Sequence, residues 1–110
     1  MNTPDLDIAQ MQAHAEQAAQ LLKAIAHPAR LRVLCRLVEG EASVGELQAG
    51  VGLSMSALSQ HLAVMRETGL VTTRREAQTI FYALADSPAL GVMQALHDAY
   101  CGRQKRRRPA

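Results

Sequence analysis

The sequence predicts a mainly helical domain that carries one β-hairpin. An amphipathic helix contains Leu58, Leu62 and Met65 at helical spacing, and a shorter helix with its own serine cap lies just before it. Two runs rich in Val, Thr, Ile, Phe and Tyr follow at residues 70–74 and 79–84, and they favour strands. Two helices around a tight turn, followed by a hairpin, make a winged helix-turn-helix.

The first helix is expected to run from residues 3–5 to about Ala26. A threonine, a proline and an aspartate at the start suit the first turn of a helix. Apolar positions then alternate in spacings of four and three, at Met11, Ala15, Ala18, Leu22 and Ile25. Such a seam is typical of helices that pack on one another. In so short a chain we expect it to meet a second copy, which predicts a homodimer.

The second helix is expected to begin at Pro28 and to end before Gly40. Proline suits the first position of a helix, and glycine suits the position after its end. Its inward stripe is expected to consist of Leu31, Leu34 and Val38. Cys35 lies on this stripe, about 40° from Leu31 by helical geometry. A small core residue is the plain interpretation of such a cysteine.

The helix-turn-helix is predicted over residues 43–69. Ser43 and Glu46 form a capping box for a helix that reaches Gln48, and the turn at residues 49–52 contains two glycines. Ser54 caps the second helix and a glycine at position 69 ends it. The exposed side of that helix carries small, mostly uncharged groups, as a helix in the DNA major groove requires. A generic helical hairpin is the alternative.

The predicted hairpin has its tip at residues 75–78, and the last helix follows from Ser87 to Gly102. One broad stripe of that helix holds Leu90, Met93, Leu96, His97, Tyr100 and Cys101. Residues 1–102 are therefore expected to form one domain. Residues 103–110 are basic and are expected to be a disordered tail, either solubilising or in non-specific contact with DNA.

The charge distribution, the apolar runs and the cysteine count limit the possible partners and the cellular compartment. The net charge is +2, but five of the twelve basic residues lie in the last eight positions, so the remaining chain is mildly acidic. Any attraction to phosphate must therefore come from local patches or from the tail. No apolar run approaches a membrane span and no signal peptide is evident, which predicts a cytoplasmic protein without a membrane partner. Two cysteines in that compartment suggest catalytic, metal-binding or redox roles.

Double-stranded DNA is the expected partner. The residues expected to face or border it are Ser54, Ser56, Ser59, Gln60, His61, Arg74 and Arg75. Gln60 is the best candidate for reading a base, because its amide can pair with adenine through two hydrogen bonds. His61 lies nearer the buried flank of the helix, so its position is compatible with two roles, packing against the core or contact with a phosphate. Arg74 and Arg75 lie at the start of the wing tip and suit phosphates or the minor groove.

Three segments together resemble the ArsR/SmtB family of bacterial winged-helix repressors. They are AHPARLRVL, LSMSALSQHLAVMRETGLV and IFYAL, and the resemblance extends from Gln17 to Tyr100. The family implies a dimer built by the first and last helices. It also implies repression through operator binding, relieved when an inducer reaches a sensing site.

The metal sites common in this family are not matched. One uses a C-x-C pair where this chain has Ser43-Val44-Gly45, and the other needs ligands where this chain has Pro88, Ala99 and Gly102. Asp86 could match only the first ligand of that second set. Zinc needs four ligands, so neither a metal nor another cofactor is expected.

Cys35 and Cys101 stand in the settings VLCRLVEGEASVGEL and AYCG. These resemble the persulfide-sensing repressors of the BigR/SqrR type and the related HlyU-type redox regulators. The resemblance implies that the reduced protein binds its operator. Reactive sulfur species or an oxidant then link the two cysteines through a disulfide or a tetrasulfide, and the DNA is released. The controlled genes would serve sulfide and oxidative stress.

Two other functions are compatible with parts of this pattern. A thiol enzyme is not expected, since the sequence has no C-x-x-C, nucleophile elbow or phosphate loop. A regulator of the same family with a metal or another non-thiol inducer is the alternative function. The sequence leaves open which cysteine would attack first.

Overall fold

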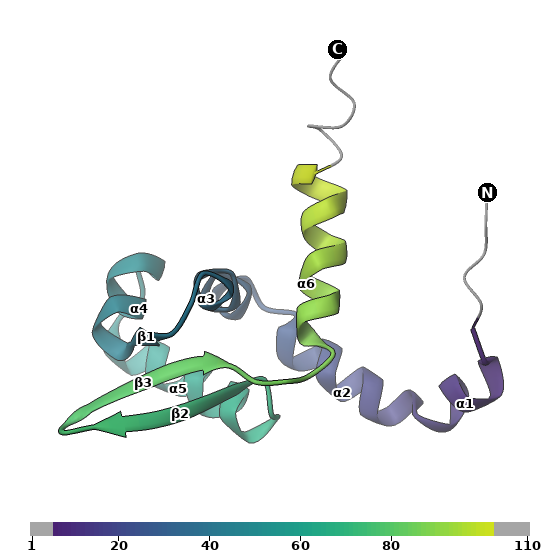
Figure 1. Ribbon diagram of the computed structural model, residues 1–110, viewed down its shortest axis with the longest axis horizontal. Helices are drawn as coiled ribbons and strands as arrows, with labels where there is room; N and C mark the ends of the chain where they lie inside the picture. Colours follow the sequence, from purple (N-terminus) through teal and green to yellow (C-terminus); the bar gives the residue numbers. More distant parts are fainter. Residues whose placement is uncertain (1–5, 103–110) are drawn as a thin grey trace, which may run out of the picture.

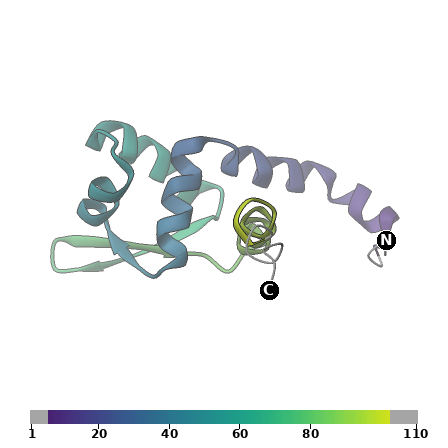
Figure 2. The same cartoon turned by 90° about the horizontal axis from the view of Figure 1, so that it is seen from above.

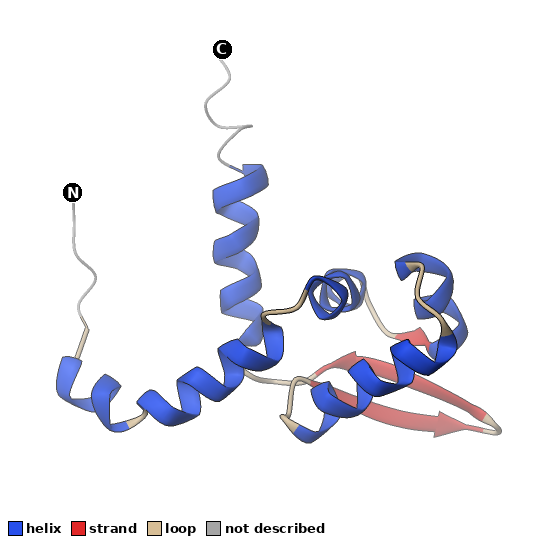
Figure 3. Ribbon diagram, turned by 180° about the vertical axis from the view of Figure 1, so that it is seen from behind, coloured by secondary structure: helices blue, strands red, loops and turns tan. Residues whose placement is uncertain are grey.

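The computed structural model describes residues 6–102 and confirms the winged helix-turn-helix (Figure 1). In chain order the elements are α1 (Ile8–Ala13), α2 (Ala15–Ile25), α3 (Pro28–Val38), β1 (Ala42–Ser43), α4 (Val44–Val51), α5 (Met55–Glu67), β2 (Val71–Glu76), β3 (Thr79–Leu84), α6 (Ala89–His97) and the π-helical turn η1 (Asp98–Gly102). The body consists of α3, α4 and α5 with the hairpin, and α5 lies against the hairpin when seen from behind (Figure 3).

The starts of the central helices follow the predicted caps. The Ser43 hydroxyl accepts a hydrogen bond from the Glu46 amide, and the Glu46 carboxylate accepts one from the Ser43 amide. The Ser54 hydroxyl accepts from the amide of Ala57 at 3.1 Å. Pro28 occupies the first turn of α3 as expected. These bonds satisfy amides that a helix start otherwise leaves without partners.

The core joins α3, α4, α5 and the base of the wing. Its largest fully buried side chains are Val33, Leu34, Leu47, Leu58, Met65 and Leu70. The predicted α5 stripe of Leu58, Leu62 and Met65 is confirmed. On α3 the predicted stripe was wrong in part, because Val33 and Leu37 are buried whereas Val38 is 51% exposed. Helix α3 turns its Val33–Leu37 side toward the core and its Val38 side toward α6.

The wing is longer than predicted. Strand β2 continues to Glu76, which pairs with Thr79, so the turn shrinks from residues 75–78 to Ala77 and Gln78. Ala77 has a φ of +56°, as a tight hairpin turn demands. A third strand, β1, pairs with β3 and gives the order β1-β3-β2. Two residues are too few to show a sequence pattern, so this strand was not predicted.

Helix boundaries also differ near the N-terminus, in α4 and in the last helix, which begins at Ala89 and is π-helical from Asp98 to Gly102. The predicted single N-terminal helix was wrong: α1 begins only at Ile8, capped by Asp7, and the chain breaks at His14 before α2. Residues 3–5, the predicted start, lie outside the described residues. Helix α4 extends to Val51, so the predicted turn shrinks and Gly52 ends the helix with a φ of +71°.

Two helical arms project from the body, α1–α2 in one direction and α6 in another (Figures 1 and 2). The radius of gyration is 16.2 Å, whereas a compact chain of this size would have about 13 Å. Large apolar side chains on the arms are exposed, namely Leu6, Ile8, Met11, Leu22, Leu90, Leu96 and Tyr100. The arms thus present apolar faces that the single chain does not cover.

Within residues 6–102, none of the helices has the length and apolar character needed to cross a lipid bilayer. The basic tail predicted at residues 103–110 lies outside the described residues.

Candidate functional site

Helix α5 presents a polar face because its opposite face is fixed in the core. With Leu58, Leu62 and Met65 buried, Ser56, Ser59 and Gln60 are exposed together. The Ser54 hydroxyl at the start of the helix is occupied by the Ala57 amide. We call this face, Ser56, Ser59 and Gln60, the reading face.

His61 turns away from the reading face toward the junction of α2 and α3. Its ring lies 4.4 Å from the ring of His27, and Arg30 Nη1 lies 3.4 Å from His61 Nδ1. Arg30 is itself held by a 2.7 Å bond from Nε to the carbonyl oxygen of Ala24. Burial lowers the pKa of His61, and the neighbouring His27 and Arg30 lower it further. His61 therefore ties α5 to the base of the arm.

Arg74 on the wing is already paired within the protein. Its Nε and Nη2 donate to the two carboxylate oxygens of Glu41 at 2.7 and 2.8 Å, and Nη1 donates to Glu76 at 3.1 Å. The guanidinium also lies 4.5 Å above the ring centroid of Phe81. These bonds hold the pKa of Glu41 below its usual value. Arg75, by contrast, is exposed and makes no ion pair among residues 6–102.

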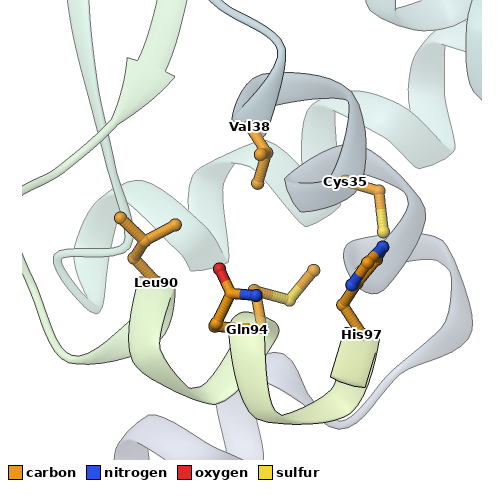
Figure 4. Close-up of a pocket in the computed structure, with 6 residues that line it drawn as sticks. Cys35, Val38, Leu90, Gln94 and His97 are labelled. Atoms are coloured by element: carbon orange, nitrogen blue, oxygen red, sulfur yellow. The ribbon is translucent and has the colours of Figure 1, made fainter. Parts of the chain in front are cut away.

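Cys35 opens into a cavity of about 280 Å³ between α3 and α6 (Figure 4). Its walls are Val38 from α3 together with Leu90, Met93, Gln94 and His97 from α6. The thiol of Cys35 points toward the His97 ring (Figure 4). The cavity thus combines a sulfur nucleophile, an apolar wall and an imidazole.

Cys101 lies on η1, about one turn beyond His97. It is exposed, it carries a free thiol like Cys35, and it is not among the residues that line the cavity. Cys35 therefore lies where α3 meets α6, whereas Cys101 lies beyond the end of α6 and does not line the cavity. Within the described residues, no three His, Cys, Asp or Glu side chains gather as a metal site would require.

Sequence reasoning missed three residues that shape these regions. His27 and Arg30 contact His61, and Glu41 pairs with Arg74. These contacts depend on the packing of the arm and on strand register, which leave no local pattern. His97 was placed by the sequence on the stripe of the last helix, four residues before Cys101, and the structure adds that it lines the cavity at Cys35.

Comparison with known proteins gives consistent matches. Residues 27–73 match the model described as bacterial regulatory protein, arsR family. The transcriptional activator HlyU of Vibrio cholerae is 47% identical over 87% of this chain and 89% of its own length. The crystal structure of the transcriptional repressor BigR from Xylella fastidiosa superposes with a TM-score of 0.82 at 44% identity, covering 87% of this chain and 98% of that one. Reduced HlyU from Vibrio cholerae gives a TM-score of 0.78 at 49% identity, covering 84% and 97%.

The lowered pKa of His61 predicts a loss of folding stability in acid. Because the folded protein holds this pKa below the usual 6.5, the unfolded chain takes up a proton first as the pH falls. The free energy of unfolding should therefore be highest, as far as His61 determines it, above about pH 6.5 and should decrease below that pH. Urea denaturation at about pH 7.5 and 5.5 measures the difference in the free energy of unfolding between the two pH values. The variant His61→Gln should show a smaller difference than the wild type.

His14→Gln, an exposed position on the arm, is the matched control and should keep the wild-type pH dependence. A His61→Gln protein that loses as much stability in acid as the wild type would contradict the assignment.

Proposed function

Because the chain belongs to the ArsR family of bacterial DNA-binding transcriptional regulators, in the branch of HlyU and BigR, we propose that its two cysteines switch operator binding. The observation that carries this proposal is the cavity at Cys35, bounded by His97 about one turn before Cys101. In the reduced protein the operator is bound and transcription is repressed. Linking the cysteines releases the DNA.

DNA is read by the reading face of α5. Gln60 pairs with a base edge, while Ser56 and Ser59 are small enough to let the helix approach the groove floor. Ser54 borders the DNA from the start of the helix, whereas His61, held against His27 and Arg30, serves packing. On the wing, Arg75 contacts a phosphate directly, whereas Arg74 must first leave its carboxylate partners.

The operator-binding form is a homodimer through the two arms. The exposed apolar side chains of α1–α2 and α6 support this, because a monomer would leave them in water. A two-fold dimer places two copies of α5 on one face of the DNA. The half-sites they read are about one helical turn, roughly 34 Å, apart.

The sensing reaction needs a thiolate and a sulfane sulfur. The Cys35 thiolate attacks the outer sulfur of a persulfide RSSH and releases RSH, which leaves a persulfide on Cys35. The Cys101 thiolate then attacks the inner sulfur of that persulfide, which forms a disulfide and releases hydrogen sulfide. In sum, RSSH and two thiols give a disulfide, RSH and H₂S. Longer sulfur bridges, up to a tetrasulfide, form when additional sulfane sulfur is retained.

The link acts on DNA binding through the scaffold. It joins α3 of the body to the end of α6, which belongs to the dimer arm. A changed angle between body and arm changes the separation of the two α5 helices, and a fixed operator tolerates little change. Loss of flexibility without movement is the other route. Structures of the reduced and linked states distinguish the two by the separation of the α5 helices.

Persulfide should weaken operator binding by the wild-type protein more than about tenfold, or 1.4 kcal/mol. Cys35→Ser and Cys101→Ser should bind DNA in reductant and keep that affinity after treatment, because neither can close the link. DNA titration and intact-mass measurement on the same samples check this, and each retained sulfur adds the mass of one sulfur atom. Variants that respond like the wild type would favour a non-thiol inducer instead.

Gln60→Ala should weaken binding to a duplex selected by the protein by roughly 1–3 kcal/mol, the value of one bidentate base contact. Binding to a random duplex should change little, since phosphate contacts supply that affinity. Titration of both duplexes measures the difference. Gln12→Ala, the same substitution on α1, is the control, and an equal loss on both duplexes by Gln60→Ala would refute base reading.

Leu22→Glu should dissociate the dimer, because it places a charge in the apolar seam of the arm. Two-fold symmetry buries this charge twice, so we expect the dimer dissociation constant to rise roughly a hundredfold or more. Sedimentation measures the change. Gln20→Glu adds the same charge on another side of α2 and should remain dimeric; dissociation of both variants alike, or of neither, would contradict the proposed interface.

A further inference from the structure

We propose that Glu41 sets how strongly the wing binds DNA phosphates, by neutralising Arg74 in the free protein. The proposal rests on the DNA-binding part of the proposed function and is independent of the cysteine switch. We call the group of Glu41, Arg74, Glu76 and Phe81 the wing clasp.

Strand register builds the wing clasp. Glu41 directly precedes β1, in which Ala42 pairs with Tyr82 of β3. On the other side of β3, Phe81 pairs with Arg74 of β2. Glu41 and Arg74 are therefore far apart in sequence, yet their side chains meet across β3, with the guanidinium above the Phe81 ring.

The wing clasp cancels the charge that the wing sequence suggests. All three nitrogens of the Arg74 guanidinium donate to carboxylates, two bonds to Glu41 and one to Glu76. Together with Arg75, these side chains carry two positive and two negative charges. The wing therefore approaches DNA without net charge, and the Glu41 carboxylate would repel a phosphate near Arg74.

A phosphate can compete with Glu41 for Arg74. Guanidinium groups bind phosphates and carboxylates with the same two-bond geometry. The pair is partly exposed, so solvent and salt screen it and a phosphate can reach the Arg74 guanidinium. Removing the charge of Glu41 should therefore free Arg74 for the backbone and give the wing one additional phosphate contact.

The test is E41Q, which keeps the size of the side chain and removes its charge. The probe is a random-sequence DNA duplex of about 30 base pairs, long enough for two half-sites roughly 34 Å apart. Affinity is titrated in reductant at several salt concentrations. E41Q should bind roughly fivefold more tightly per wing at about 0.15 M salt, and its slope of log K against log salt should steepen by about 0.9 per wing.

E39Q is the matched control. It makes the same charge change two residues earlier, at a carboxylate that is 75% exposed and lies 4.0 Å from Arg36. It should keep the wild-type slope. The double variant E41Q/R74Q should lose the gain, because the gain requires the Arg74 guanidinium. Circular dichroism melts verify that each variant is folded.

Equal salt slopes for E41Q and E39Q would overturn the proposal. So would a gain that persists in E41Q/R74Q, or weaker binding by E41Q, which would mean that Glu41 serves only to stiffen the wing. If E41Q, E39Q and the wild type all fail to bind the duplex at low salt, DNA binding itself is refuted. A missing response to persulfide leaves this test unaffected, because it is run in reductant.

Discussion

The burial of one stripe of α5 determines how the rest of this protein can act. Leu58, Leu62 and Met65 are buried in one core with side chains of α3 and α4, and this fixes the rotation of α5. The reading face is exposed only because the opposite side has no freedom to turn. His61 adds a polar tie from the same helix to the base of the arm. Helix α5 is therefore held to the body of the protein, so that its exposed face keeps one orientation relative to α3 and to the base of the arm.

Features governed by neighbours in the sequence could be predicted. The caps at Ser43 and Ser54, the proline start of α3 and the α5 stripe depend on residues a few positions apart, and the structure confirms them. Features governed by distant packing could not. The exposure of Val38 and the pairing of Arg74 with Glu41 depend on how helices and strands meet.

The candidate sensor illustrates the same division. The sequence places Cys35 and Cys101 on two helices and a family resemblance couples them, which stays a prediction. The structure adds a cavity at Cys35 and the imidazole of His97 beside it. Helical spacing alone predicts neither the cavity nor the closeness of His97 to Cys35, because both arise where α3 and α6 approach each other. The apolar faces of the arms were predicted in part, since Met11, Leu22 and Leu90 lie on stripes that the sequence shows, and the structure leaves these side chains exposed.

The two-residue strand β1 connects these regions within one chain. It follows α3 after only three residues, and its pairing with β3 joins the cysteine-bearing helix to the root of the hairpin. Ala42 is fully buried and Tyr82 nearly so, which places this pairing inside the core. Because the pairing couples the end of α3 to β3, a rotation of α3 would displace the root of the hairpin within the same chain.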